Sequence, residues 1–234
     1  MLHFMFGEPE RELDGPFAEA CQLMDRFAVM MAARIRADGD PSNKLRKFEV
    51  WTYGLRSSLT ELEQSQYAAS RFKDKISSTS VEGMTAEERM DYARYVYFDK
   101  NSFIRVFSLL DKLGTFLNEL LDMRTEKIKP HFSYFTVLRN MRERKAHPEL
   151  TWKLNDIKEQ GKESMNRLRK RRNMEIHYMN SEMQDDLIQS QRMYGEEIRL
   201  ENIELQALDL SRCLYMSIES LRLTYLYAGS LMRK

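Results

Sequence analysis

Apolar residues recur every three or four positions along most of the chain, and the alternation typical of surface strands is missing from the sequence. The clearest run lies between positions 103 and 121, where the spacing puts leucine and aromatic side chains on one face of a helix. Its members are Phe103, Val106, Phe107, Leu110, Leu113, Leu117, Leu120 and Leu121. Such a face must pack on other helices, so the run predicts a helical bundle.

Glycine, proline and capping residues divide this pattern into helices. Asp14 stands before a Gly-Pro pair at the start of the first, and Thr85 with Glu88 has the sequence of a capping box. Pro148 ends another helix, because the residue before a proline avoids the helical region. The expected helices cover residues 15–37, 45–76, 85–123, 133–145, 149–191 and 203–225. We therefore predict one all-α domain over residues 1–234, an up-and-down bundle of about five or six helices.

Charge is balanced over the whole chain. The sequence contains 37 Lys and Arg against 36 Asp and Glu, which gives a formal net charge of +1. A dedicated DNA-binding protein would carry a clear basic excess, so any nucleic-acid site must be a local patch. The run "RLRKRR" at residues 167–172 is the densest basic stretch, but a helix distributes consecutive charges over all its sides. Only part of this run can face one ligand.

Cysteine content and hydropathy indicate a cytoplasmic protein. Cys21 and Cys213 lie far apart without the spacing of a metal site, which favours a reducing compartment. The longest apolar run, "FAVMMAA", is too short to cross a bilayer, and the N-terminus lacks the pattern of a signal peptide. We expect neither export nor membrane anchoring.

Several cofactor and nucleophile chemistries lack their motifs. None of the four histidines follows a glutamate by three positions, as a di-iron helical bundle requires. The sequence has no glycine-rich phosphate loop or dinucleotide fingerprint, and no serine or cysteine nucleophile signature. We therefore expect no metal and no cofactor.

The segment "RRNMEIHYMN", residues 171–180, places Arg172 five positions ahead of His177, with four residues between them. Chance alone produces such a spacing about once in this chain, and Arg142 with His147 repeats it. His147 directly precedes a proline and so belongs at a helix end or in a turn, whereas Arg172 and His177 lie inside a continuous helical pattern. Context therefore favours Arg172 and His177 as the functional pair.

Helical geometry allows this segment to act on RNA. Asn173 and His177 fall about 40° apart around the helix, while Arg172 lies about 140° from His177 and must reach around with its long side chain. Histidine can transfer a proton near neutral pH, and arginine binds phosphate oxygens with a planar fork. Because RNA carries an internal nucleophile in its 2′-hydroxyl, such a pair can cleave a strand without metal.

Arg172, Asn173, His177 and the following Tyr178 resemble the arginine-polar-x-x-x-histidine signature of the HEPN superfamily, an all-α group that includes many ribonucleases. The segment "YFDKNSFIRVFSLLDKLGTFLN" is similar to the second core helix of bacterial HEPN proteins. The resemblance covers roughly residues 90–231. It implies a HEPN-like core at residues 85–234 and an N-terminal helical extension at residues 1–84. It also implies a homodimer in which two motif helices share one cleft.

Three functional hypotheses follow. The first is a metal-independent endoribonuclease of toxin or defence type, with Arg172 and His177 catalytic and with Asn173, Arg171 and Tyr178 contacting the substrate. An antitoxin or a nucleotidyltransferase would then be its partner protein. The second is a HEPN module that binds RNA or a nucleotide without cleaving it, and the third is an interaction bundle in which the motif is a dimer contact. Beside the apolar run, we expect Gly114 to let two helices approach closely.

Overall fold

The computed structural model describes residues 5–8, 14–177 and 202–233, and its regular elements are helical. The described residues contain seven α-helices and one short 3-10 helix, so the all-α class is confirmed with slightly more helices than expected. They are α2 (Gly15–Asp38), α3 (Lys44–Lys73), α4 (Ala86–Leu120), η1 (Thr125–Lys127), α5 (Tyr134–Glu143), α6 (Pro148–Gln160), α7 (Lys162–His177) and α9 (Ile203–Leu231). None of the described helices is long and apolar enough to span a membrane.

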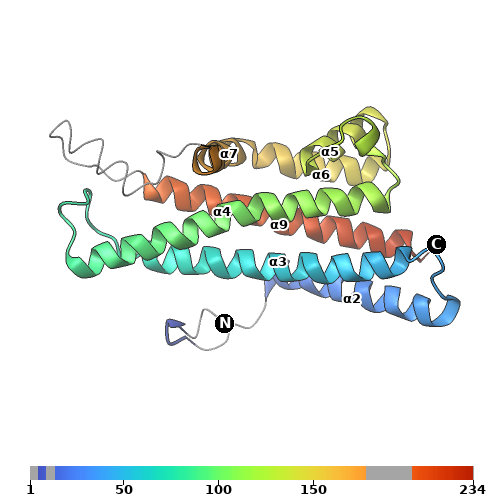
Figure 1. Cartoon of the computed structure of the whole chain (residues 1–234), viewed down its shortest axis with the longest axis horizontal. Coiled ribbons are helices and arrows are strands. Elements are labelled where there is room, and N and C mark those ends of the chain that lie inside the picture. Colours follow the sequence, from blue (N-terminus) through green and yellow to red (C-terminus); the bar gives the residue numbers. More distant parts are fainter. Residues whose placement is uncertain (1–4, 9–13, 178–201, 234) are drawn as a thin grey trace.

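The four long helices α2, α3, α4 and α9 lie side by side along the length of the molecule (Figure 1). The chain reverses direction from α2 to α3 and again from α3 to α4, which confirms the up-and-down arrangement. The shorter helices α5, α6 and α7 form a layer over α4 and α9. Because α4 and α9 lie between this layer and the rest of the bundle, the segment with Arg172 rests directly on the core.

The core forms around the apolar face of α4. All eight members of the run predicted from the sequence are buried, as expected. The ring of Phe116 lies at the centre of an aromatic cluster that joins all four long helices. It contacts Phe27 of α2, Phe48 of α3 and Tyr225 of α9, at centroid distances of 5.9, 5.6 and 5.0 Å. Aromatic pairs at these distances contribute beyond their buried area, roughly 0.5–1.5 kcal/mol each.

The start of α4 differs in one detail from the predicted capping box. The Thr85 hydroxyl accepts the Glu88 N–H at 3.1 Å, as expected. The Glu88 carboxylate instead accepts the backbone N–H groups of Ser77 and Ser78, both at 2.6 Å, and these bonds lower its pKa to about 2. Glu88 thus fixes the α3–α4 loop, because these two amides lie outside any helix and need an acceptor.

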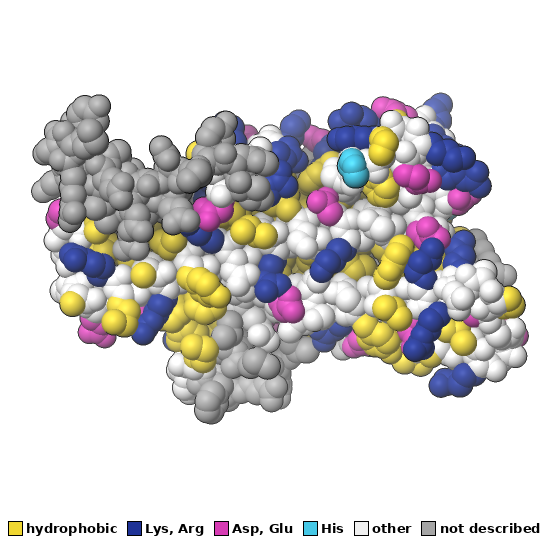
Figure 2. Space-filling view, in the orientation of Figure 1, with side chains coloured by type: hydrophobic (Ala, Val, Ile, Leu, Met, Phe, Trp, Pro, Cys, Tyr) yellow, Lys and Arg dark blue, Asp and Glu magenta, His cyan; other side chains and the backbone are white. Residues whose placement is uncertain are grey.

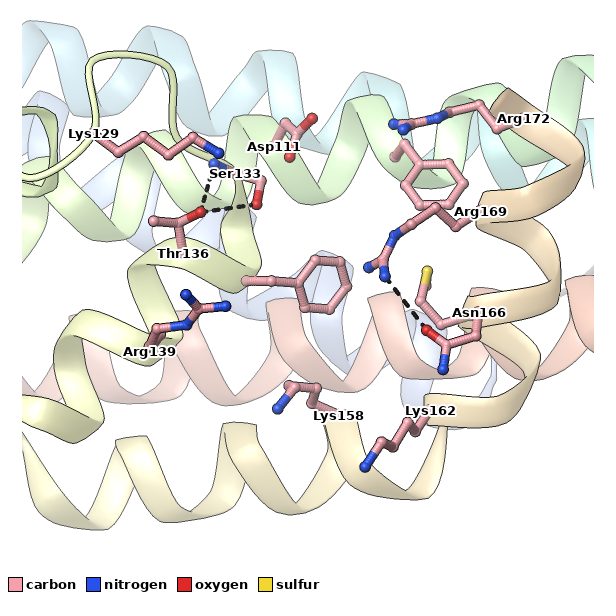
Figure 3. A pocket seen from close by; sticks show the side chains of 13 residues that line it. Asp111, Lys129, Ser133, Thr136, Arg139, Lys158, Lys162, Asn166, Arg169 and Arg172 are labelled. Atoms are coloured by element: carbon pink, nitrogen blue, oxygen red, sulfur yellow. Dashed lines mark hydrogen bonds between the residues drawn. The ribbon is translucent and has the colours of Figure 1, made fainter. Parts of the chain in front are cut away.

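The prediction of one continuous helix from residue 149 through the motif is wrong. The chain forms α6 and α7, which meet at Gly161 and run in different directions (Figures 1 and 3). Gly161 is buried against α9, and a Cβ atom added there would lie 3.0 Å from the sulfur of Met216. The bend lets α6 and α7 both pack on α9. The part of the predicted helix beyond His177 lies outside the described residues.

Gly114 allows the close approach that the sequence predicts. A Cβ atom added at Gly114 would lie 2.7 Å from the Cα atom and 2.8 Å from the backbone nitrogen of Tyr134, the first residue of α5. One turn earlier on α4, Asp111 accepts the Tyr134 N–H at 3.4 Å. The buried Tyr134 hydroxyl donates to Ser220 of α9 at 3.0 Å. The start of α5 is therefore held against both α4 and α9.

Replacing Gly114 with alanine should lower the free energy of unfolding by about 1–3 kcal/mol, because the new methyl group meets backbone atoms that cannot rotate away. Urea denaturation measures this change. Gly54→Ala in α3 is the matched control, since an added Cβ meets nothing within 4 Å there. The control should leave stability unchanged or raise it by up to about 1 kcal/mol. Equal stabilisation by both substitutions would contradict the close packing at Gly114.

Candidate functional site

Arg172 lies against α4 rather than in open solvent. Its guanidinium stacks over the ring of Phe107, 4.5 Å from the ring centroid. Its Nε and Nη2 atoms donate to the side-chain oxygen of Asn173 at 3.2 and 2.8 Å. Phe107 and Asn173 thus hold the Arg172 guanidinium in one orientation before any ligand binds, which reduces the conformational entropy lost on binding. The structure therefore brings two of the predicted site residues together.

Arg171 points to a different part of α4. It forms an ion pair with Asp99, whose side chain is fully buried, and its guanidinium lies 5.0 Å from the ring centroid of Phe103. Nearby, Lys100 of α4 pairs with Glu175 of α7 at 3.1 Å. These contacts attach α7 to α4. That Arg171 contacts a substrate stays a prediction.

Two predicted site residues fall outside what the structure describes. His177 is the last residue of α7, but its side chain is not among the described parts, and neither is any atom of Tyr178. Convergence of His177 with Arg172 and Asn173 therefore stays a prediction. The alternative pair is better defined. His147 occupies the N-cap position of α6, at φ 45°, and so lies at a helix end as expected. Its Nδ1 atom is 2.6 Å from the Tyr227 hydroxyl oxygen.

A pocket of about 420 Å³ opens between α4, α5, α6 and α7, beside Arg172. Six basic side chains line it: Lys129, Arg139, Lys158, Lys162, Arg169 and Arg172. The other lining residues are Phe107, Asp111, Ser133, Phe135, Thr136, Met165 and Asn166. Figure 3 shows Lys129 and Arg139 on one side of the pocket and Arg169 and Arg172 on the other. Figure 2 shows several Lys and Arg side chains close together over α5 and α6. The pocket therefore concentrates positive charge in a chain that is nearly neutral.

Few carboxylates offset these charges. Glu159 pairs with both Lys158 and Lys162, at 2.7 and 3.0 Å, and these partners lower its pKa to about 2. In the part of the chain that the structure describes, the other four basic residues of the pocket form no ion pair: Lys129, Arg139, Arg169 and Arg172. An anionic ligand would supply the missing negative charge.

Asp111 is the single acidic residue among the described residues that line this pocket. Its side chain keeps contact with solvent, yet burial of the carboxyl group among protein atoms raises its pKa, an effect that the hydrogen bond from the Tyr134 N–H and the positive charge of Arg172 partly offset. The oxygen atoms of this partly exposed carboxyl group can accept a hydrogen bond from a hydroxyl group of a ligand. Its negative charge opposes an anion in the same pocket.

Sequence reasoning missed most of this pocket. Arg169 and Arg172 belong to the basic run, but Lys129, Arg139, Lys158 and Lys162 were not predicted as site residues. One signal was present, because Lys158, Lys162, Asn166 and Arg169 follow one another at spacings of four, four and three. Such a stripe suggests a common polar face even across the bend at Gly161.

The comparisons with known proteins agree with this architecture. A family model described as Cthe2314-like HEPN matches residues 51–229, which is most of the chain. The chain belongs to this HEPN family. The match includes both α4 and the motif helix α7, so the resemblance seen in the sequence is confirmed. No curated protein and no solved structure matches the chain.

Within this HEPN fold, the family match extends beyond the motif-bearing region. It begins inside α3, whereas the resemblance seen in the sequence covered roughly residues 90–231. Helices α2 and α3 also contribute to the same hydrophobic core as α4 and α9. The division into a HEPN-like core and an extension at residue 85 stays a prediction.

The buried environment of His147 predicts how the stability of the protein depends on pH. Burial lowers its pKa from the ordinary value near 6.5, so the folded state favours the neutral imidazole. Its contribution to stability should be present above about pH 6.5 and be lost as the pH falls through the folded-state pKa. Urea denaturation at about pH 7.5 and 5.5 should show a smaller loss of stability at low pH in His147→Asn than in the wild type. Asparagine tolerates the left-handed backbone at this position. Identical pH dependence in both proteins would contradict the assignment.

Proposed function

We propose that this HEPN protein is a metal-independent endoribonuclease that binds the scissile phosphate at Arg172. The observation that carries the proposal is the position of Arg172, the arginine of the family motif, in the wall of a pocket lined by six basic side chains. Phosphate is the group that such a pocket suits best, because arginine offers paired donors and lysine offers compact positive charge.

The chemistry uses the substrate's own nucleophile. His177 removes the proton from a 2′-hydroxyl group, whose oxygen attacks the adjacent phosphorus atom. The bond to the 5′-oxygen of the next nucleotide then breaks, and that oxygen takes up a proton. The products are a 2′,3′-cyclic phosphate and a 5′-hydroxyl end. Arg172 stabilises the extra negative charge that develops on the phosphorane.

The contacts of Arg172 suit this role. Phe107 supports one face of the guanidinium, and Asn173 accepts from Nε and Nη2. Among the contacts of the described residues, this arrangement leaves Nη1 for a phosphate oxygen. A donor that is already oriented stabilises transition-state charge without first reorganising.

The wider setting is part of the same proposal. We propose a homodimer in which two copies of α7 face one another, so that two Arg172 and two His177 residues share the RNA. A toxin or defence role in the cytoplasm, restrained by an antitoxin or a nucleotidyltransferase partner, is consistent with membership of the HEPN superfamily.

Binding of RNA or a nucleotide without cleavage is the second candidate function. It is favoured by Lys129, Arg139, Lys158 and Lys162, which add charge to the pocket from outside the catalytic motif.

Single substitutions of the motif should separate these two functions. His177→Ala and Arg172→Ala should each lower the cleavage rate of single-stranded RNA by roughly a hundred- to ten-thousand-fold in the presence of EDTA. The double variant should lose less than the product of the two factors, because both side chains act on one transition state. Products should carry 2′,3′-cyclic phosphate ends, and DNA should stay intact because it lacks the 2′-hydroxyl group.

The second arginine–histidine pair is the internal control for this experiment. Arg142→Ala and His147→Asn change the same residue types outside the pocket and should leave cleavage nearly unchanged. Unfolding curves of every variant identify any loss that comes from misfolding. If the wild type cleaves no RNA, including transfer RNA, the enzyme proposal is wrong and RNA binding by the same pocket becomes the better function. If the control pair matters more than Arg172 and His177, the choice of motif is wrong.

A further inference from the structure

The basic residues of the pocket converge from several elements. Lys129 lies between η1 and α5, Arg139 belongs to α5, Lys158 belongs to α6, and Arg169 belongs to α7 (Figure 3). A solvated helix face would show charges from one helix spread around its circumference. Here, four segments place positive charge around one cavity. The folding of the chain, rather than the basic run alone, therefore creates this concentration of charge.

Further contacts around the pocket favour the binding of an anion. Arg169 lies over the ring of Phe135, 5.2 Å from the centroid, and donates to the side chain of Asn166 at 3.4 Å. Ser133 and Thr136, which form the capping box of α5, line the same pocket. The positive end of the α5 dipole thus adds to the field of the basic side chains. These features favour a ligand whose negative charge lies between α5 and α7.

The size and the apolar wall of the pocket define the ligand further. A volume of about 420 Å³ falls within the range of pockets that hold small organic ligands, and it exceeds the need of a phosphate ion alone. Phe107, Phe135 and Met165 supply apolar surface. A base can stack on an arginine plane such as that of Arg169, and the carboxyl group of Asp111 can accept a hydrogen bond from a ribose hydroxyl or a base amine. The combination of charge, flat surface and acceptor fits a nucleoside phosphate.

We propose that this pocket is a recognition subsite for one nucleotide of single-stranded RNA, held next to the phosphate that Arg172 contacts. A base inside a duplex is stacked on both faces and paired along one edge, so it cannot enter the pocket without leaving the helix. The identity of the ligand as RNA rests on the proposed function, but the binding step does not depend on cleavage. The subsite would fix the register of the strand relative to Arg172.

A binding titration in the His177→Ala background tests the subsite without cleavage. The probe is a fluorescently labelled, single-stranded RNA of about ten nucleotides, measured by anisotropy at several salt concentrations. Arg139→Gln combined with Lys158→Gln should weaken binding about tenfold or more. The loss of two phosphate contacts should also reduce the slope of log affinity against log salt by about 1.4. Asp111→Asn should strengthen binding, because it removes the negative charge from the pocket and keeps a side-chain oxygen that accepts a hydrogen bond.

The same two helices offer a matched control. Arg142→Gln combined with Lys153→Gln removes the same charges from α5 and α6, but neither residue lines the pocket, and Lys153 pairs with Glu149 at 2.7 Å. This control should bind the RNA almost as well as the His177→Ala parent. Equal losses in both double variants would overturn the subsite and indicate a diffuse electrostatic attraction. Urea midpoints of the variants confirm that each protein remains folded.

Duplex RNA and a free nucleotide test whether the pocket is specific for a nucleotide of single-stranded RNA. Duplex RNA of the same length should bind more weakly than the single strand, and equal affinity would overturn the proposal. Adenosine monophosphate should compete weakly with the labelled RNA in the parent protein. If the monophosphate binds in the pocket while the Arg139 and Lys158 substitutions leave RNA affinity unchanged, the pocket takes a free nucleotide and the RNA subsite is wrong. Cleavage by the wild type is measured separately, so a protein that binds through the pocket without cleaving retains the subsite and loses the proposed enzymatic function.

Discussion

The ion pair between Arg171 of α7 and the buried Asp99 of α4 fixes the Arg172 end of the motif helix on α4. Removing either partner would leave a buried charge, which typically costs about 3–5 kcal/mol. The pair also determines which arginine reaches the pocket. With Arg171 turned towards Asp99 and Phe103, its neighbour Arg172 lies over Phe107, one helical turn beyond Phe103 on α4. Adjacent residues of the same type therefore have different surroundings, one paired with α4 and one lining the pocket.

Two glycines complete the surroundings of Arg172. Gly114 lets the start of α5 lie against α4, which brings Ser133 and Thr136 to one wall of the pocket. Gly161 lies where α6 and α7 meet in contact with Met216, and the change of direction there brings Lys158 to the wall opposite α4. The pocket thus depends on backbone positions that carry no chemistry of their own. Arg172 acquires its electrostatic environment from these packing constraints.

Local patterns predicted the parts of the fold that depend on periodicity. The apolar face of α4, the close approach at Gly114 and the helix-end position of His147 all follow from residue type and spacing, and the structure confirms each of them. The HEPN resemblance rested on Arg172, His177 and the sequence of α4, and the family match confirms it. These features could be predicted from the sequence because each is determined by residues close together in the chain or by one dominant spacing.

Features that depend on tertiary packing were not predicted. The bend at Gly161 was missed because the polar pattern continues through it, and its reason is contact with Met216, which is distant in the sequence. The pairing of Arg171 with Asp99 joins residues 72 positions apart. The pocket likewise combines side chains from α4, α5, α6, α7 and the segment before α5, so no short stretch of sequence contains it.

The most direct test of the account is a crystal structure of the His177→Ala protein with a short single-stranded RNA. The account predicts a phosphate oxygen within about 3 Å of the Arg172 guanidinium and an adjacent nucleotide between Arg139, Lys158 and Arg169. It also predicts two copies of α7 facing the same RNA. RNA bound on a surface that excludes Arg172, with the basic pocket empty, would contradict the central claim.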